Sequence, residues 1–307
     1  MWNLDGTRPI IIEAKVLTEM PAPLRRPVST PWADANKAGE PVDCFLEGPS
    51  FDRQGNLYVV DIPHGRILRI DPGLNWSVVA EYEGWPNGSA FHRDGSLWIA
   101  DYRRGLLRVD VTTGRSETLL GHRNSESFKG LNDLTFDRDG RCYFTDQGQT
   151  GLQDPTGRVF RWDHRTGQLD CLLSTAPSPN GLLLDLHGKA LYVAVTRANA
   201  VWRGPLQRDG SLSKVGAFRT FYGASGPDGM ALDSEGRLVV AHASLGAAFV
   251  IDARGHVTHI VRSPVGTTIT NVAYRPGTAD VVLTESLTGT VLVAALPAKG
   301  AQLFSHM

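Results

Sequence analysis

The chain has 307 residues, of which 31 are basic and 32 acidic, and 41% are hydrophobic. This length suits one large all-β or barrel-like domain, and the apolar fraction is sufficient for a core. The net charge of −1, without a basic block, argues against nucleic acid or an anionic membrane surface as a partner. No apolar run reaches the roughly 18 residues of a membrane span, so we expect none.

The N-terminal residues and the cysteines bear on the compartment. The first residues lack the long apolar segment of a signal peptide. Cys44, Cys142 and Cys171 are too scattered for a metal-binding pair or a disulfide framework, and their odd number suits a reducing environment. We therefore expect a cytoplasmic protein that is a monomer or a weak homo-oligomer.

The run "PIIIEAKVLTE", residues 9–19, is apolar and rich in β-branched residues, and it belongs to none of the repeats that follow it. We expect it to pair with the last repeat and close a ring, which would remove an exposed sheet edge. The C-terminal "AQLFS" is the alternative closing strand. Residues 20–45, with five prolines, are expected to form a long loop.

One sequence pattern then recurs six times, as in "EGPSFDRQGNLYVVD" and "NDLTFDRDGRCYFTD". The interval between copies is 40 to 48 residues, within the range typical of β-propeller repeats. The six copies begin at Glu47, Asn87, Asn132, Asn180, Asp228 and Thr270.

Each copy predicts the same local structure. A short apolar run ends at a polar pair followed by Gly, as in "DRQG" and "DSEG", which is typical of a hairpin turn. A second strand, a third such as "GRILRID" and a more variable fourth follow. No segment shows a helical period over three turns. The sequence therefore predicts an all-β single domain over residues 1–307, a six-bladed β-propeller of four-stranded antiparallel blades.

The first residues of the six copies should meet at one end of the central channel, because the innermost strand of each blade lines it. They comprise two carboxylates, three carboxamides and one hydroxyl, and none is aliphatic. Oxygen donors of this kind suit a hard divalent cation, which would also relieve the repulsion between Glu47 and Asp228. The alternative is turn chemistry, since Asn87, Asn180 and Asp228 each precede a Gly.

The ends of the second strands return to the same face of the propeller. Strand-end capping is the plainer interpretation of Asp61 and Asp101, whereas Asp146 and His242 are candidates for substrate contact. Tyr102 is a further candidate at the mouth of the pocket.

The pieces "LEGPSFDRQGNLYVVDI", "LNDLTFDRDGRCYFTD", "SPNGLLLD" and "GPDGMALD" resemble, in this order and spacing, the senescence marker protein/gluconolactonase/luciferin-regenerating enzyme family. The resemblance covers residues 44–296. It implies a divalent cation in the channel held by Glu47, Asn180 and Asp228, with Asn132 as a fourth ligand or a substrate contact. Calcium is the expected ion, with zinc, manganese, magnesium or iron as alternatives.

The resemblance also implies the activity, a metal-dependent hydrolase that opens a small lactone. Asp228 is the base that it favours, and metal-bound hydroxide and His242 are the alternatives. An organophosphate triesterase-like hydrolase on the same site is the second functional hypothesis. A propeller that only binds a partner protein is the third, and a propeller related to strictosidine synthase is a more distant one.

The sequence departs from the family near Asn132. Some sugar-lactone members carry an Arg two residues before the matching Asn, where this chain has Gly130 preceded by Lys129. The substrate-binding residues that we expect are Asn132, Asn87, Lys129, Tyr102, Asp146 and His242. Gluconolactone itself is not specifically predicted, and an acidic or aromatic-pathway lactone is an equal alternative.

Overall fold

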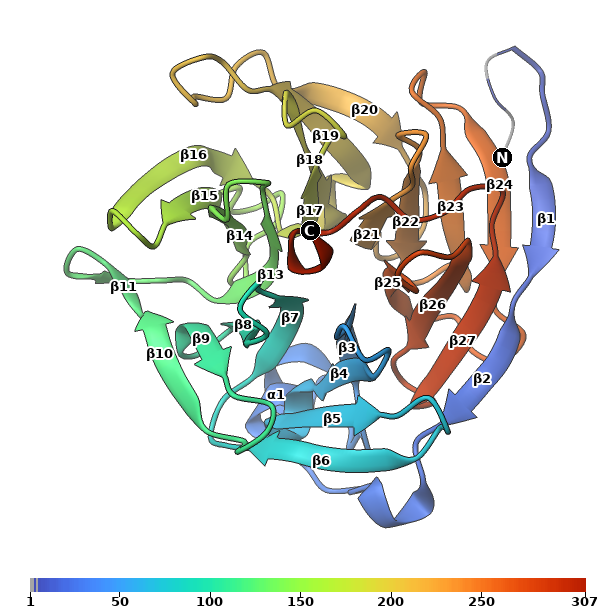
Figure 1. Cartoon of the computed structure of the whole chain (residues 1–307). Coiled ribbons are helices and arrows are strands. Elements are labelled where there is room, and N and C mark those ends of the chain that lie inside the picture. The colour runs from blue at the N-terminus through green and yellow to red at the C-terminus, as the bar shows by residue number, and fades with distance from the viewer. Residues whose placement is uncertain (1–2, 4) are drawn as a thin grey trace.

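Six sheets stand around a central channel, as Figure 1 shows. The computed structural model describes residue 3 and residues 5–307. The innermost strands of neighbouring sheets contact one another around the whole ring. This arrangement confirms the predicted six-bladed β-propeller.

Each of the first three blades consists of four consecutive antiparallel strands. The first blade contains β3 (Leu46–Phe51), β4 (Leu57–Asp61), β5 (Arg66–Ile70) and β6 (Trp76–Glu81). The second contains β7 (Pro86–Phe91), β8 (Leu97–Asp101), β9 (Gly105–Val109) and β10 (Ser116–Leu120). The third contains β13 (Leu131–Phe136), β14 (Cys142–Asp146), β15 (Gly157–Asp163) and β16 (Gln168–Ala176). A small hairpin between the second and third blades is formed by β11 (His122–Arg123) and β12 (Glu126–Ser127).

The fourth and fifth blades repeat this order, and the sixth supplies three strands of its own. The fourth contains β17 (Pro179–Leu184), β18 (Ala190–Val195), β19 (Ala200–Pro205) and β20 (Gly216–Thr220). The fifth contains β21 (Pro227–Leu232), β22 (Leu238–His242), β23 (Ala247–Ile251) and β24 (Val257–Arg262). The sixth contains β25 (Ile269–Tyr274), β26 (Asp280–Glu285) and β27 (Thr290–Ala295).

The N-terminal segment contributes to two blades rather than one. β1 (Ile10–Glu13) pairs in parallel with β24, as a fifth strand of the fifth blade. β2 (Lys15–Glu19) pairs antiparallel with β27 and supplies the fourth strand of the sixth blade. Both strands run along the outer edge of the ring (Figure 1). The segment thereby bridges the fifth and sixth blades and covers an outer strand of each.

Helical structure is confined to short turns. The only α-helix among the described residues is α1 (Pro31–Asn36), whose first turn is capped by Thr30, because Thr30 Oγ1 accepts the backbone N–H of Ala33 at 3.2 Å. The 3₁₀ turns are η1 (Ala22–Leu24), η2 (Ile62–His64), η3 (Thr196–Ala198) and η4 (Phe304–His306). In the part of the chain that is described, no helix has the length and apolarity needed to cross a membrane.

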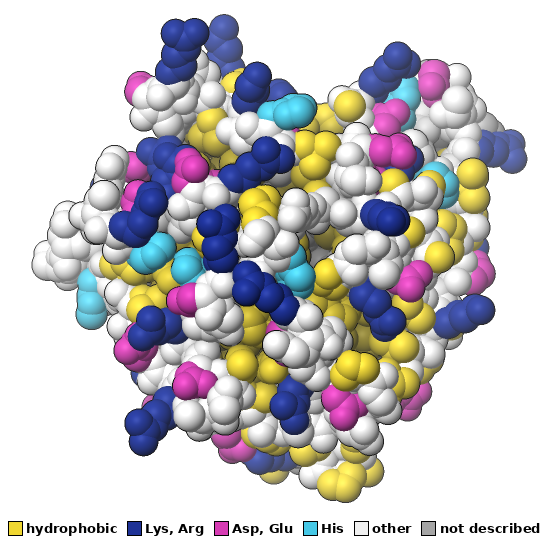
Figure 2. Space-filling view, in the orientation of Figure 1, with side chains coloured by type: hydrophobic (Ala, Val, Ile, Leu, Met, Phe, Trp, Pro, Cys, Tyr) yellow, Lys and Arg dark blue, Asp and Glu magenta, His cyan; other side chains and the backbone are white. Residues whose placement is uncertain are grey.

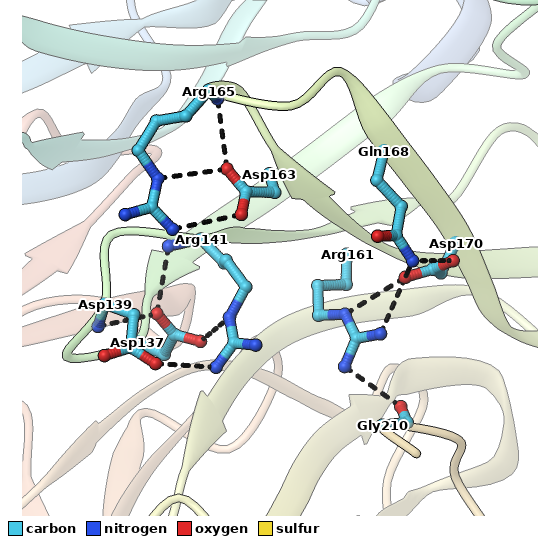
Figure 3. Close-up of polar contacts among 9 residues, drawn as sticks. All are labelled: Asp137, Asp139, Arg141, Arg161, Asp163, Arg165, Gln168, Asp170 and Gly210. Carbon is cyan, nitrogen blue, oxygen red and sulfur yellow. Dashed lines mark hydrogen bonds and ion pairs between the residues drawn. The ribbon is translucent and has the colours of Figure 1, made fainter.

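The hairpin turns between first and second strands have the chemistry that the sequence predicted. In the third blade, Asp137 accepts the backbone N–H groups of Asp139 and Arg141, both at 2.9 Å, and its other oxygen pairs with the Arg141 side chain (Figure 3). Gly140 takes a φ of 84° at this turn, in the left-handed region that favours glycine. Asp52 and Asp233 accept the corresponding N–H groups in the first and fifth blades. These turns define one end of the channel.

The C-terminal tail, residues 299–307, covers this end. The N–H of Ala301 donates to the carbonyl of Leu232 at 2.9 Å, and Arg53 Nε donates to the carbonyl of Ser305 at 2.8 Å. Phe304 packs against Phe136 with ring centroids 5.5 Å apart, and η4 lies over the centre of the ring in Figure 1. A largely apolar cavity of about 790 Å³ lies beneath the tail. Basic and acidic side chains are interspersed over this face (Figure 2).

Candidate active site

The opposite end of the channel carries a ring of polar side chains. Each belongs to the second residue of an innermost strand, and all but Asn87 are buried. We call this set the channel ring, and it comprises Glu47, Asn87, Asn132, Asn180, Asp228 and Thr270. The structure thus brings the two carboxylates and two of the amides that were proposed as ligands to one end of the channel.

A β-bulge occurs at this level in every innermost strand. The pairing of β3 with β4 shifts between Glu47 and Ser50, and that of β13 with β14 shifts between Leu131 and Leu134. The other four innermost strands shift at the equivalent place. A bulge interrupts the alternation of side chains between the two faces of a sheet, so two consecutive residues can turn toward the channel.

The second residue of each bulge forms a layer below the channel ring. In four blades it is a glycine, and in the other two it is Asp133 and Asn271. A Cβ on Gly88 would lie 2.3 Å from Asp133 Oδ1, and one on Gly229 would lie 2.1 Å from the side-chain amide of Asn271. The glycines are therefore needed to make room for these two polar side chains.

Glu47 is fully enclosed but has no cationic partner among the described residues. Its Oε2 accepts the N–H of Gly48 and the Nδ2–H of Asn271, both at 2.8 Å. Burial raises the pKa of Glu47, and these hydrogen bonds act in the opposite direction. The carboxylate is therefore oriented by neutral donors that leave its negative charge uncompensated.

Asp228 lies close enough to Glu47 for the two charges to interact strongly. Burial raises the pKa of Asp228 well above its usual range, and the charges of Glu47 and Asp133 raise it further. A hydrogen bond from Asn180 opposes this rise. Burial likewise raises the pKa of Asp133 to about 8, and the Glu47 charge adds to the rise. Three carboxyl groups thus share one enclosed region, and no ion pair joins any of them to a described Lys or Arg within 4.0 Å.

This environment fits a divalent cation. A dication would compensate two buried like charges that the protein itself does not neutralise. No cluster of three or more His, Cys, Asp or Glu side chains that could hold a metal occurs among the described residues. Glu47 and Asp228 could supply two carboxylate donors, and the amide oxygens of Asn132 and Asn180 would complete an all-oxygen set that suits calcium.

Asn132 is held by a chain of side-chain hydrogen bonds. Its Nδ2 donates to Gln147 Oε1 at 3.0 Å, and Gln147 Nε2 donates to Ser178 Oγ at 2.9 Å. The N–H of Ser178 donates in turn to Thr150 Oγ1 at 3.0 Å. Because its amide nitrogen is engaged with Gln147, the carbonyl oxygen of Asn132 is the atom that it can offer to a cation or a substrate.

The acidic residues at the ends of the second strands are bound differently. Asp61 accepts the N–H of Phe45 at 2.8 Å and pairs with the fully buried Arg66. Asp146 accepts the N–H of Gly130 at 2.9 Å and pairs with Arg158. Asp101 accepts the N–H groups of Arg103 and Arg104, and Glu285 accepts that of Thr268, but neither acid has an ion-pair partner among the described residues. We call Asp61, Asp101, Asp146 and Glu285 the strand-end acids. Each anchors a loop on the face of the channel ring.

The other proposed substrate contacts lie on the loops of this face. Tyr102 packs directly over Gly130, where a Cβ would lie 2.5 Å from its ring, and its hydroxyl accepts a hydrogen bond from Gln149 at 3.2 Å. Lys129 Nζ donates to Thr156 Oγ1 at 2.9 Å. The Tyr102 ring thus occupies the space that a side chain at position 130 would need.

His242 is fully buried between Phe221 and Phe249, with centroid separations of 5.6 and 6.2 Å. Among the described residues, neither of its ring nitrogens has a hydrogen-bond partner within 3.5 Å. Burial lowers the pKa of His242 to about 4, so the ring is neutral at physiological pH.

Sequence reasoning missed Asp133, Lys37 and Arg197. Asp133 follows a predicted ligand, and strict alternation along a strand would have turned it away from the channel. The available signal was its position, since four of the six copies have Gly there. Lys37 lies in the segment 20–45, for which the sequence predicts a long loop, yet its ammonium group is within electrostatic range of Asp228, as is the Arg197 guanidinium. No local sequence pattern identifies either cation.

The chain is similar in sequence to curated lactonases. The chain is 28% identical over 263 residues to lactonase drp35 of Staphylococcus epidermidis, which covers 82% of this chain and 76% of that protein. The corresponding lactonase of Staphylococcus aureus strain MW2 is 29% identical over 264 residues, with 81% of this chain and 75% of that protein covered.

Solved structures share the fold. A gluconolactonase from Xanthomonas campestris superimposes with a TM-score of 0.74 at 22% identity, covering 92% of this chain and 99% of that one. The calcium-binding protein regucalcin from Agrobacterium tumefaciens gives 0.73 at 19% identity, covering 97% and 98%. The model of the SMP-30/Gluconolactonase/LRE-like region matches residues 45–285, which include every residue of the channel ring. The chain therefore belongs to the SMP-30/gluconolactonase/LRE-like family.

Proposed function

We propose that the protein is a metal-dependent lactonase whose active site is the channel ring. The observation that carries the proposal is the pair of enclosed carboxylates, Glu47 and Asp228, which no described cation neutralises by direct contact. The lactonase names of the curated relatives support the reaction class. The calcium-binding description of regucalcin supports the choice of calcium.

In this proposal Glu47, Asn180 and Asp228 hold the ion, and Asn132 is a fourth ligand or a contact of the substrate. A divalent cation supplies Lewis-acid polarisation of a carbonyl and stabilisation of the negative charge that develops on its oxygen. Glu47 is kept in position by Gly48 and Asn271. Asn132 is kept in position by Gln147, which directs its carbonyl oxygen away from that contact.

Hydrolysis of the ring also requires a group that takes a proton from water. We assign this role to Asp228, which lies in the channel ring and is enclosed. The raised pKa of Asp228 belongs to the metal-free protein, and a bound cation would lower it, so the assignment rests on the place of Asp228 in the channel ring. The proton would pass from the attacking water to an Asp228 oxygen and then to the alkoxide of the opened ring. His242 is less suited to this role, because its ring is enclosed by Phe221 and Phe249.

The test combines metal analysis with a substrate panel. The purified protein should contain, or take up, about one divalent ion per chain and should release acid from five- and six-membered lactones in a pH-indicator assay. A chelator should abolish the activity and calcium should restore it. If the metal-loaded protein leaves all lactones intact but cleaves phosphotriesters, the organophosphate hydrolase hypothesis replaces this proposal. Inactivity toward both classes would favour a binding protein.

A further inference from the structure

Two cationic side chains near the channel ring come from elements of different blades. Lys37 follows α1, which packs on the first blade, and Arg197 lies in η3 of the fourth blade. In a ring of six, the first and fourth blades face each other across the channel. Asp228 is within electrostatic range of both side chains, although neither forms an ion pair among the described residues.

The structure holds Lys37 in a defined position. Its backbone N–H donates to the carbonyl of Ala33 at 2.7 Å and ends the helix. The Nζ atom lies 4.7 Å from the ring centroid of Phe45 and 5.9 Å from that of Trp32, and these two rings pack 4.7 Å apart. Such contacts stabilise an ammonium group without neutralising it. Phe45 is only two residues from Glu47, so the aromatic support of Lys37 adjoins the channel ring.

Keeping the Lys37 ammonium group charged beside the channel ring costs free energy. Burial lowers the pKa of Lys37, while the charges of Asp228 and Glu285 act in the opposite direction. Once a dication occupies the channel ring, Asp228 no longer offers Lys37 its full charge, and the cation and the ammonium repel each other. An anion between them would relieve both effects.

The second cation, Arg197, is positioned by the 3₁₀ turn η3. η3 is fixed at its first residue, since Thr196 Oγ1 donates to the carbonyl of Pro227 at 2.8 Å and its N–H donates to that of Ser178 at 3.0 Å. The Arg197 side chain is exposed. It therefore contributes a weaker, more screened attraction than Lys37.

Resting on the proposed lactonase function, we infer that the substrate is an anionic lactone, one that carries a free carboxylate, and that Lys37 is its principal specificity residue. The lactone carbonyl lies toward the channel ring, and the carboxylate lies toward Lys37, with Arg197 adding attraction from the fourth blade. A polyhydroxylated neutral sugar lactone would provide no negative charge to pair with the Lys37 ammonium group.

The kinetic test compares two lactones of similar shape at saturating calcium. 5-Oxotetrahydrofuran-2-carboxylate carries the charge, and γ-valerolactone has a methyl group in its place. We expect the charged lactone to be favoured in kcat/KM by at least about tenfold, as for one charge-assisted contact. Lys37→Met should remove most of this preference, Lys37→Arg should keep it, and Arg197→Met should reduce it less. Lys189→Met, in a turn at the other end of the channel, should leave the preference unchanged.

A binding measurement separates this inference from the reaction itself. Tetrahydrofuran-2-carboxylate should raise the melting temperature of the calcium-loaded protein more than the neutral tetrahydrofurfuryl alcohol does, and Lys37→Met should cancel the difference. If neither lactone is hydrolysed but this difference is found, the proposed reaction fails and the anion site stands. Equal use of both lactones, equal binding of both probes, or a preference unaffected by Lys37→Met would overturn the inference.

Discussion

The channel ring and the strand-end acids both contain buried carboxylates, yet their surroundings differ. Asp61 is paired with Arg66 and accepts a backbone N–H, whereas Glu47 and Asp228 accept hydrogen bonds only from neutral groups. Burial of a carboxylate is costly unless it is compensated. Asp61 and Asp146 are compensated by arginines of the protein itself, Arg66 and Arg158, which gives these two acids a structural role. The carboxylates of the channel ring lack such compensation, which is what a binding site for a cation requires.

The largest effect is expected from removing one negative charge from the channel ring. We expect Asp228→Asn and Glu47→Gln each to lower kcat by about 10²–10⁴-fold, since both weaken the cation site and the first also removes the proposed base. Activity and metal content measured across a calcium titration test this. At saturating calcium, Glu47→Gln should recover in part and Asp228→Asn should not. Equal recovery of both would rule out Asp228 as the base.

The same chemical change in a strand-end acid should lower the stability of the protein and leave its calcium affinity unchanged. Asp61→Asn leaves the buried Arg66 without its partner, so we expect a loss of about 3–5 kcal/mol in the free energy of unfolding, with unchanged calcium affinity. Urea unfolding and calcium titration measure the two quantities. The double change Asp61→Leu with Arg66→Met should recover much of the stability, because no charge is then left buried. A loss of calcium affinity in Asp61→Asn would show that the two sets are not separate.

Removal of the metal should make stability depend on pH. Asp133, with a pKa raised to about 8, and Asp228 hold protons in the folded state at pH values where the unfolded chain has released them. Their contribution to stability is thus complete at acid pH, below the unfolded pKa of about 4, and is lost as the pH rises through the folded pKa. The metal-free protein should therefore become less stable between pH 6 and 9, and calcium should restore it.

Melting temperatures in calcium and in chelator measure this effect. At a calcium concentration 100 times the dissociation constant, the stabilisation is about 2.7 kcal/mol, and the gap between the two conditions should widen with pH. Asp133→Asn, which removes one of the titrating groups, should flatten the response of the metal-free protein. A gap that stays constant from pH 6 to 9 would contradict the view that these carboxyls lack compensation.

The smallest effect is expected at His242, the one second-strand end with a histidine. Its folded pKa of about 4 lies below the usual 6.5, so the unfolded chain binds a proton that the folded protein does not as the pH falls through this window. Stability is therefore lost on acidification, by at most about 1.4 kcal/mol per pH unit. His242→Phe should remove this component, change stability near pH 7.5 by less than about 1 kcal/mol, and preserve activity. A large loss of activity would restore His242 as a catalytic candidate.

The fold was predictable because the sequence pattern of one blade recurs six times along the chain. The repeat spacing and the Asp- and Gly-containing turns each recur, so local signals reinforce one another. The positions of the channel ring follow from the same alignment. The inward position of Asp133 does not follow from it, because the β-bulge in β13 interrupts the alternation of side chains between the two faces of a strand. The roles of Lys37 and Arg197 depend on the packing of a loop and a turn around the channel mouth, which no short-range pattern encodes.

The path of the N-terminal strands has a consequence for how the chain is made. β2 is synthesised early, but Lys15 pairs with Val293, so its partner leaves the ribosome only after nearly the whole chain. At typical rates of synthesis this delay is on the order of ten seconds or more. During that time β1 and β2 are unpaired apolar strands, which could associate with other chains. We therefore expect recombinant yield to depend on translation speed and chaperone supply more than on the stability of the finished protein.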